Sequence, residues 1–311
     1  MVDLEKSKQK SRTVATAKKS RAVTGQKKSR SGLIGWSAVA AVLVAVGVIV
    51  VVSLSGSSES SSKYTFEKAP ASVVDPVVNV PLASFNGATS APNVPGAPLL
   101  PTKGQDILKV KNGVGQTLPY VYYDGSEHCP YCAAQRWAIV AALARFGTFS
   151  NLGLTTSSAV DVYPSTNTFT FWKSKYVSDY ITFDSTENLT NIVSGNSYLP
   201  LEKRSAFNTK LVDKYDNPPF VPESMKGGWP FMDFGNQVIA PGPTFSPAYL
   251  QGMTWQEIAD SLKHPETPVA QQILTASNYL SAAVCAIDGQ QPASVCTSSG
   301  VRAAAAKIPL K

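Results

Sequence analysis

The amino-acid sequence predicts an α/β protein that is preceded by one transmembrane helix. An apolar strand at 119–123 runs directly into a helix that begins at Cys129, which makes a βα unit. Strand-like segments, a polar helix, a hairpin around a two-residue turn and two closing helices follow in that order. An uncharged apolar run at 33–54 predicts the transmembrane helix.

The N-terminal tail, residues 1–32, is strongly basic. Residues 1–30 hold ten of the 28 Lys and Arg residues and two of the 21 Asp and Glu residues, which leaves 18 basic and 19 acidic residues in the rest of the chain. The net charge of +7 therefore belongs to the tail, and a nucleic-acid groove on the main domain gains no support from it. We expect no nucleic-acid partner.

Residues 33–54 contain no charged side chain, and Val, Ala, Leu and Ile dominate them. A helix of this length is roughly 33 Å long, which is enough to cross the hydrocarbon core of a bilayer. A cleaved signal peptide has a shorter apolar run, so a retained membrane anchor is the better interpretation. Because positive flanks stay in the cytoplasm, we expect a single-pass protein of the cell membrane with a cytoplasmic N-terminus and an extracytoplasmic main domain.

Residues 55–102 are rich in Ser and Pro, and we interpret them as an extended stalk. Short strand-like pieces such as Val77–Leu82 are expected to pack onto the main domain. The compact extracytoplasmic domain is expected over residues 103–311, and it contains no internal repeat.

Local signals predict the elements of this domain. The helix after Cys129 is expected to run to about Phe146, because apolar residues recur at helical spacing and Gly147 follows. Thr254 and Glu257 have the spacing of a capping box, which predicts the start of a later helix. The other expected elements are strands at Pro119–Tyr123, Val160–Tyr163, Thr168–Trp172 and Tyr180–Phe183, a helix at Leu201–Tyr215, hairpin strands at Phe231–Phe234 and Gln237–Ile239 around Gly235-Asn236, and a helix from Thr267 to about Ile287.

Cys129 and Cys132 carry the strongest chemical signal. Their C-x-x-C spacing places both sulfurs on one turn of helix, and Cys129 falls at the helix N-terminus, where free N–H groups and the helix dipole favour a thiolate. We predict that Cys129 is the nucleophile of a thiol–disulfide exchange site and that Cys132 is its resolving thiol. A static disulfide or a degenerate site is the alternative, and a metal site is disfavoured because the chain has no second C-x-x-C.

The chain resembles the thioredoxin-like superfamily over roughly residues 105–288. The resemblance rests on the strand that leads into Cys129-Pro130-Tyr131-Cys132, on the β and α elements that follow, and on Gly228-Trp229-Pro230 before the last hairpin. It implies a central mixed sheet flanked by helices, with a long insertion before the strand that follows Pro230. It also implies that Pro230 is cis and lies against the cysteine pair, although a plain strand-entry proline is the alternative.

More narrowly, the runs at 125–138 and 284–296 resemble a prokaryotic membrane-anchored family catalogued as a domain of unknown function (number nine hundred twenty-nine). That family implies no settled activity. Two departures from the thioredoxin pattern stand out. About a hundred residues separate the C-x-x-C from Pro230, and Glu127-His128 replace the Trp that usually precedes the motif.

Three residues beside the cysteines are expected to bind substrate or to tune the thiol. A charged His128 would lower the pKa of Cys129, and a solvated turn residue is an equal alternative. Tyr131 and Trp229 are expected to form an apolar rim for substrate, or else to be ordinary packing residues.

Cys285 and Cys296 are expected to form a structural disulfide, because they lie eleven residues apart near the end of the last helix. Such a bridge contributes roughly 2–3 kcal/mol and would pin the last segment of the chain. The alternative is a second redox pair that relays electrons to Cys129 and Cys132.

These observations together predict a membrane-anchored, extracytoplasmic thiol–disulfide oxidoreductase. Its expected partners are cysteine-containing exported proteins and a redox partner that recycles the cysteine pair. No cofactor and no metal are expected, because the cysteines themselves carry the two electrons. The alternative is a non-catalytic binding or scaffold module on the same fold, with a structural C-x-x-C disulfide.

Overall fold

The computed structural model describes residues 64–89 and 99–309. The expected tail at 1–32, the expected transmembrane helix at 33–54 and the first residues of the expected stalk lie outside the described residues. Within the described part, none of the helices combines the length and the apolar character that crossing a bilayer requires. The described residues all belong to one compact unit that contains residues 62–311.

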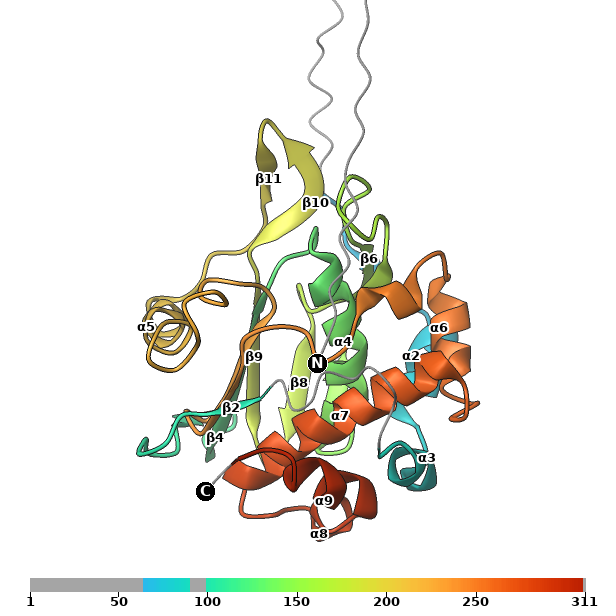
Figure 1. Cartoon of the computed structure of the whole chain (residues 1–311). Helices are drawn as coiled ribbons and strands as arrows, with labels where there is room; N and C mark the ends of the chain where they lie inside the picture. Colours follow the sequence, from blue (N-terminus) through green and yellow to red (C-terminus); the bar gives the residue numbers. More distant parts are fainter. Residues whose placement is uncertain (1–63, 90–98, 310–311) are drawn as a thin grey trace, which may run out of the picture. The chain divides into compact units, whose positions relative to one another are not determined.

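A mixed sheet of six strands organises the described residues (Figure 1). Its strands follow the order β2-β13-β12-β4-β3, and β9 pairs with the later half of β4. Strand β9 runs parallel to β4, and the other pairs are antiparallel. The strands are β2 Leu100–Pro101, β3 Lys109–Lys111, β4 Thr117–Gly125, β9 Thr182–Glu187, β12 Phe231–Phe234 and β13 Val238–Ala240. The predicted α/β class, with a mixed sheet and helices, is confirmed.

Strand β4 is buried on both faces because side chains alternate across a strand and each face has its own core. Val121 and Tyr123 belong to the larger core, together with residues of helices α4 (Pro130–Leu143) and α7 (Pro268–Ile287). Tyr120 and Tyr122 belong to a smaller core that includes residues of helix α5 (Ala206–Tyr215). Figure 1 shows α4 and α7 on one side of the sheet and α5 on the other.

The helices begin where the sequence places capping residues. Cys129 is the N-cap of α4, with Pro130 as its first residue, and Thr267 caps α7. The predicted capping box of Thr254 and Glu257 is confirmed at the start of α6, where both reciprocal hydrogen bonds form. The remaining helices are α2 Ala71–Val78, α3 Leu82–Gly87, α6 Trp255–Ser261, α8 Ala293–Cys296, α9 Ser299–Ala305 and the 3-10 helix η1 Pro247–Leu250.

The expected extended stalk is wrong for residues 64–89. These residues form β1 (Glu67–Lys68), α2 and α3, and they bury Val73, Val77 and Phe85 in the larger core. Two of the prolines that suggested an extended chain serve instead as N-caps, Pro70 for α2 and Pro81 for α3, where a missing N–H costs nothing, and Pro76 lies inside α2. The compact fold therefore already includes residue 64 and does not begin near residue 103.

Short strands fill the long segment between α4 and α5. The expected strands at 168–172 and 180–183 correspond to β7 and β9, shifted by a few residues. The expected strand at Val160–Tyr163 is wrong, because these residues form turns with Val160 and Val162 exposed and no partner strand covers them. The strands of this segment are β5 Gly147–Ser150, β6 Gly153–Thr156, β7 Asn167–Thr170, β8 Lys175–Ser178, β10 Leu189–Ser194 and β11 Ser197–Pro200.

Candidate active site at the start of helix α4

Cys129 and Cys132 lie on the first turn of α4, directly after the end of β4. The backbone N–H of Cys132 donates a hydrogen bond to Cys129 Sγ at 3.2 Å. Both thiols are free in the structure. An N-cap sulfur that accepts a helix N–H is in the position where negative charge is best stabilised.

The two thiols differ in burial and in acidity. Cys129 is 8 % exposed and Cys132 is completely buried. A hydrogen bond with the Cys132 side chain, the Cys132 N–H and the charge of Arg136 lower the pKa of Cys129, while burial opposes them. Burial raises the pKa of Cys132 well above its ordinary value. Cys129 is therefore the thiol that ionises first and the more exposed of the two, although both are buried.

Pro230 lies beside Cys129 in space, although a hundred residues separate them. The Trp229–Pro230 peptide bond is cis, as the resemblance implied. The Trp229 carbonyl oxygen lies 3.8 Å from Cys129 Sγ and accepts a weak hydrogen bond from it. Pairing of β12 with β4, with Phe231 opposite Asp124, brings this carbonyl to the start of α4.

A buried carboxylate holds Trp229 in place. The Trp229 indole Nε1–H donates a hydrogen bond to Asp124 Oδ2 at 2.7 Å. Arg204 donates two more bonds to the same carboxylate, from Nε at 2.7 Å and from Nη2 at 2.6 Å. Asp124 and Arg204 were not predicted from the sequence as site residues. The available signal was an acidic residue at the end of an otherwise apolar strand, where a buried carboxylate needs charged or hydrogen-bonding partners.

His128 is part of an aromatic group beside Cys129. Its ring stacks on Tyr198 of β11 with centroids 4.1 Å apart, and it meets the edge of Trp229 at 5.8 Å. His128 Nδ1 shares a hydrogen bond of 2.7 Å with Ser126 Oγ. Burial lowers the pKa of His128, which favours the neutral ring, so a charged His128 is a poor explanation for the acidity of Cys129.

Tyr131, between the two cysteines, is 37 % exposed. Its ring meets the edge of Tyr163 with centroids 6.0 Å apart. Tyr163 belongs to the turn that also exposes Val160 and Val162. The expected apolar rim thus has Tyr131 facing solvent, whereas Trp229 lies mainly against His128 and Asp124.

A buried charge cluster lies one turn further along α4. Arg136 donates hydrogen bonds to both Glu187 oxygens, from Nε at 2.8 Å and from Nη2 at 2.6 Å, and both side chains are fully buried. Burial raises the pKa of Glu187 to about 7 and also raises the pKa of Glu127, which accepts a hydrogen bond from Thr170. This ion pair was not predicted from the sequence, because Glu187 is 51 residues from Arg136 and the parallel pairing of β9 with β4 brings the two together.

Cys285 and Cys296 form a disulfide between the end of α7 and α8, so the predicted pairing is present. Ile287, close to this disulfide in the chain, packs against Gly235. Gly235 directly follows the last residue of β12, whereas Pro230 directly precedes the first residue of this strand. Five extended residues span roughly 17 Å. The disulfide and Cys129 therefore lie at opposite ends of the hairpin, and a direct relay within one chain is not supported.

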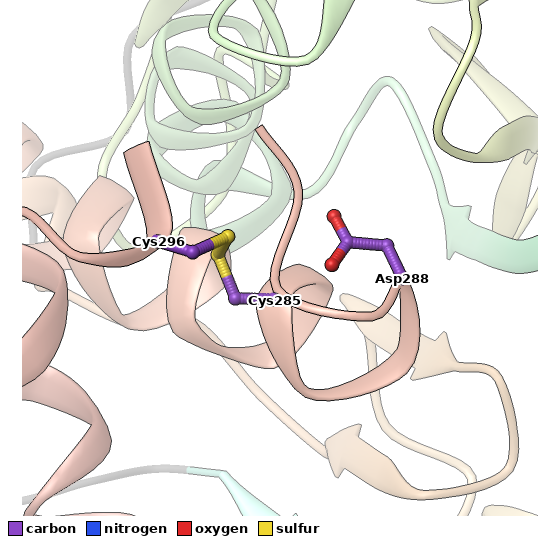
Figure 2. A group of neighbouring side chains, drawn as sticks. All are labelled: Cys285, Asp288 and Cys296. Atoms are coloured by element: carbon purple, nitrogen blue, oxygen red, sulfur yellow. A yellow bond between two sulfur atoms is a disulfide. The ribbon is translucent and has the colours of Figure 1, made fainter. Parts of the chain in front are cut away.

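Asp288 lies next to this disulfide (Figure 2). One carboxylate oxygen and the two sulfurs are within 4.8 Å of one another, which is a spacing that a metal ion could use. Both sulfurs are engaged in the disulfide, however, so neither offers the thiolate that a metal requires.

Comparison with known proteins gives one match. The model of the family described as Domain of unknown function (DUF929) matches residues 109–286, a segment that contains both free cysteines, Arg136, Trp229 and Pro230. No curated protein and no solved structure matches the chain. The match supplies a family and no activity.

Proposed function

The chain belongs to the DUF929 family, and we propose that it is a thiol–disulfide oxidoreductase that acts on cysteines of exported proteins through Cys129 and Cys132. The family description names no activity. The single observation that carries the proposal is the asymmetry of the pair. Cys129 caps a helix, has a lowered pKa and is the more exposed thiol, while Cys132 is buried and protonated. Such a difference is what a nucleophile and a resolving thiol require.

The proposed exchange conserves atoms and electrons. The Cys129 thiolate attacks one sulfur of a substrate disulfide, a mixed disulfide forms, and the other substrate sulfur leaves as a thiolate that takes a proton from water. Cys132 then loses its proton and attacks Cys129 Sγ, which closes the Cys129–Cys132 disulfide and releases the second substrate thiol. Two electrons pass to the substrate, and the reverse sequence oxidises a substrate dithiol.

The surroundings of Cys129 support this chemistry. The helix N-terminus and Arg136 stabilise the thiolate both before attack and each time it leaves. The Trp229 carbonyl faces the sulfur and is available to an incoming peptide N–H once a substrate displaces the Cys129 contact. Asp124 and Arg204 position that carbonyl through the Trp229 indole.

A thioredoxin-like fold is part of the proposal. Three features support it: a C-x-x-C helix directly after β4, the parallel neighbour β9, and the β12–β13 hairpin introduced by a cis-proline beside the cysteines. The membrane anchor at 33–54 and the extracytoplasmic location of the domain complete the proposal, and they rest on the sequence pattern.

A non-catalytic binding module is the second candidate function. The observation that favours it is the small exposure of Cys129, 8 %, because a sealed thiol cannot exchange with a protein substrate. The aromatic group of His128, Tyr198 and Trp229 would then be the functional surface.

Trapping of a mixed disulfide tests the two candidates. The Cys132→Ser variant of the full chain is incubated with an unfolded cysteine-containing protein whose cysteines have been reduced and then mildly oxidised to disulfides. The products are separated without reductant. We expect a covalent adduct through Cys129 and no adduct with the Cys129→Ser variant. In the original protein, we expect the Cys129–Cys132 pair to have a reduction potential above about −300 mV. Absence of the adduct, or a potential below that value, would favour the binding module.

A further inference from the structure

A cavity of about 730 Å³ lies beside the Cys285–Cys296 disulfide, far from Cys129. Residues of α7 and α9 and the turn at 103–104 form its walls. Both cysteines of the disulfide are among its lining residues. Its volume falls within the range of sites that hold small molecules, roughly 300–1,000 Å³.

The lining of this cavity suits an anion. Among the described residues that line it, the charged side chains are Lys103 and Arg302, and no carboxylate is present. Gln237 and Gln290 supply amide groups, and alanines of α7 and α9 leave the space open. Gln290 Nε2 also donates a hydrogen bond of 2.5 Å to the Cys285 carbonyl, which holds this amide at the disulfide.

Asp288 is an acid within reach of both sulfurs. Its carboxylate lies within 4.8 Å of them and faces the disulfide (Figure 2). One oxygen, Oδ1, accepts the Gln291 N–H at 3.1 Å, whereas the buried Oδ2 has no hydrogen-bond partner. Burial raises the pKa of Asp288 to about 6, so the carboxyl can hold a proton close to neutral pH.

We propose that this cavity binds an anionic low-molecular-weight thiol and that the Cys285–Cys296 disulfide exchanges with it. The disulfide provides the electrophile, and Lys103 and Arg302 attract the acidic groups of the thiol. Asp288 donates a proton to the sulfur that leaves. This second exchange site goes beyond the proposed function, because it uses neither Cys129 nor Cys132.

The proposed exchange at the disulfide conserves atoms and electrons. The thiolate of the bound molecule attacks one cysteine sulfur, a mixed disulfide forms, and the other cysteine sulfur leaves with the electron pair of the broken S–S bond. Cys285 is near the C-terminal end of α7 and Cys296 ends α8, where the helix dipole disfavours a thiolate. The leaving sulfur therefore takes the proton of Asp288, which regains it from water. A second thiol molecule attacks the mixed disulfide, releases its own disulfide and leaves two cysteine thiols.

The experiment compares the reactions of two small thiols with the full chain carrying both Cys129→Ser and Cys132→Ser. These substitutions remove the thiols of the first site. Glutathione is the anionic probe, and cysteamine is a cationic probe of similar thiol acidity. Rates of Cys285–Cys296 reduction are followed under native conditions by alkylation and mass measurement. We expect glutathione to react about tenfold faster per thiolate than cysteamine, with a rate that saturates as its concentration rises.

The double variant Lys103→Gln, Arg302→Gln is expected to lose this preference. Lys210→Gln, an exposed lysine of α5 on the other side of the sheet, is the matched control and keeps it. The same chain in urea provides the intrinsic reactivity, in which the preference disappears. Equal native rates for both probes, or reduction only after unfolding, overturn the proposal whether or not Cys129 proves to be an exchange thiol.

Discussion

The two cysteine pairs of this protein occupy opposite ends of helices, and the difference decides their chemistry. Cys129 caps the N-terminus of α4 and accepts a helix N–H, whereas Cys285 and Cys296 lie at the C-terminal ends of α7 and α8. A helix stabilises negative charge at its N-terminus and opposes it at its C-terminus. The first pair is therefore suited to carry a thiolate, and a sulfur of the second pair needs a proton donor when its disulfide opens.

The neighbouring charges strengthen this contrast. Arg136, a buried cation, lowers the pKa of Cys129, while the carboxylate of Asp288 lies within 4.8 Å of both sulfurs of the second pair. The comparison teaches that the residue type alone says little about a cysteine. Its place on a helix and the charged groups around it determine how readily it carries a thiolate.

Removal of Arg136, the cation that lowers the pKa of Cys129, is expected to have the largest effect on the stability of the protein. Arg136→Met leaves the Glu187 carboxylate buried without its partner, and we expect a loss of about 3–5 kcal/mol in the free energy of unfolding, measured by urea denaturation. The double variant Arg136→Met, Glu187→Met is expected to recover most of this loss. A single variant that loses less than about 1 kcal/mol would show that the ion pair does not support the site.

Alkylation rates give the next largest difference, this time within the first pair. At pH 7 iodoacetamide is expected to modify Cys129 at least about 100-fold faster than Cys132, because only Cys129 ionises readily and meets solvent. The rate for Cys129 should rise with pH through a midpoint below the pKa of an ordinary cysteine thiol. Peptide mass mapping measures both values. Equal labelling, or a midpoint at or above that pKa, contradicts the assigned roles.

Deletion of the second pair tests its bracing role. Cys285→Ala with Cys296→Ala is expected to lower the free energy of unfolding by about 2–3 kcal/mol, since the bridge closes a loop across an eleven-residue separation. Alkylation of Cys129 should be unchanged, because the two pairs lie at opposite ends of the β12–β13 hairpin. Slower alkylation in this variant would reveal a coupling that the comparison denies.

Asp233 on β12, the strand between the two regions, is expected to produce the smallest effect. Burial raises its pKa to about 7, and its Oδ2 has no partner. Since the folded pKa lies above the unfolded value of about 3.9, the neutral acid contributes stability that is complete below pH 4 and is lost as the pH rises through 7. Asp233→Asn should therefore match the original protein at pH 4 and exceed it at pH 8.

A shift of about 3 pKa units sets an upper limit of about 4 kcal/mol for the gain at pH 8, and we expect a fraction of this limit. The gain is measured as the shift of the urea transition between the two pH values. Glu187, Glu202 and Asp216, whose pKa values are also raised to about 7, titrate in the same range and remain in both proteins. The difference between the two curves isolates Asp233. A variant that is less stable at pH 8 would show that Asp233 serves the hairpin as an ionised group through its bond to the Asn236 N–H.

Elements with strong local signals were predictable from the sequence. The strand before Cys129, the helix that this cysteine caps, the hairpin around Gly235-Asn236 and the capping box at Thr254 all appear close to their expected bounds. Each depends on residues within one or two turns of chain, so the information is present in a short window. The same holds for the place of Cys129 at a helix N-terminus.

The contacts between segments that are distant in the sequence were decided only by the tertiary structure. Proline content suggested an extended stalk at 64–89, yet Val73, Val77 and Phe85 found an apolar core to enter, and burial outweighed the local pattern. The Arg136–Glu187 pair, the hydrogen bond from Trp229 to Asp124 and the stacking of His128 on Tyr198 each join residues that lie 51 to 105 positions apart. Sequence determined which residue types were available near Cys129. The charge that tunes it was set by strand pairing, because electrostatic contacts depend on distance in space and not along the chain.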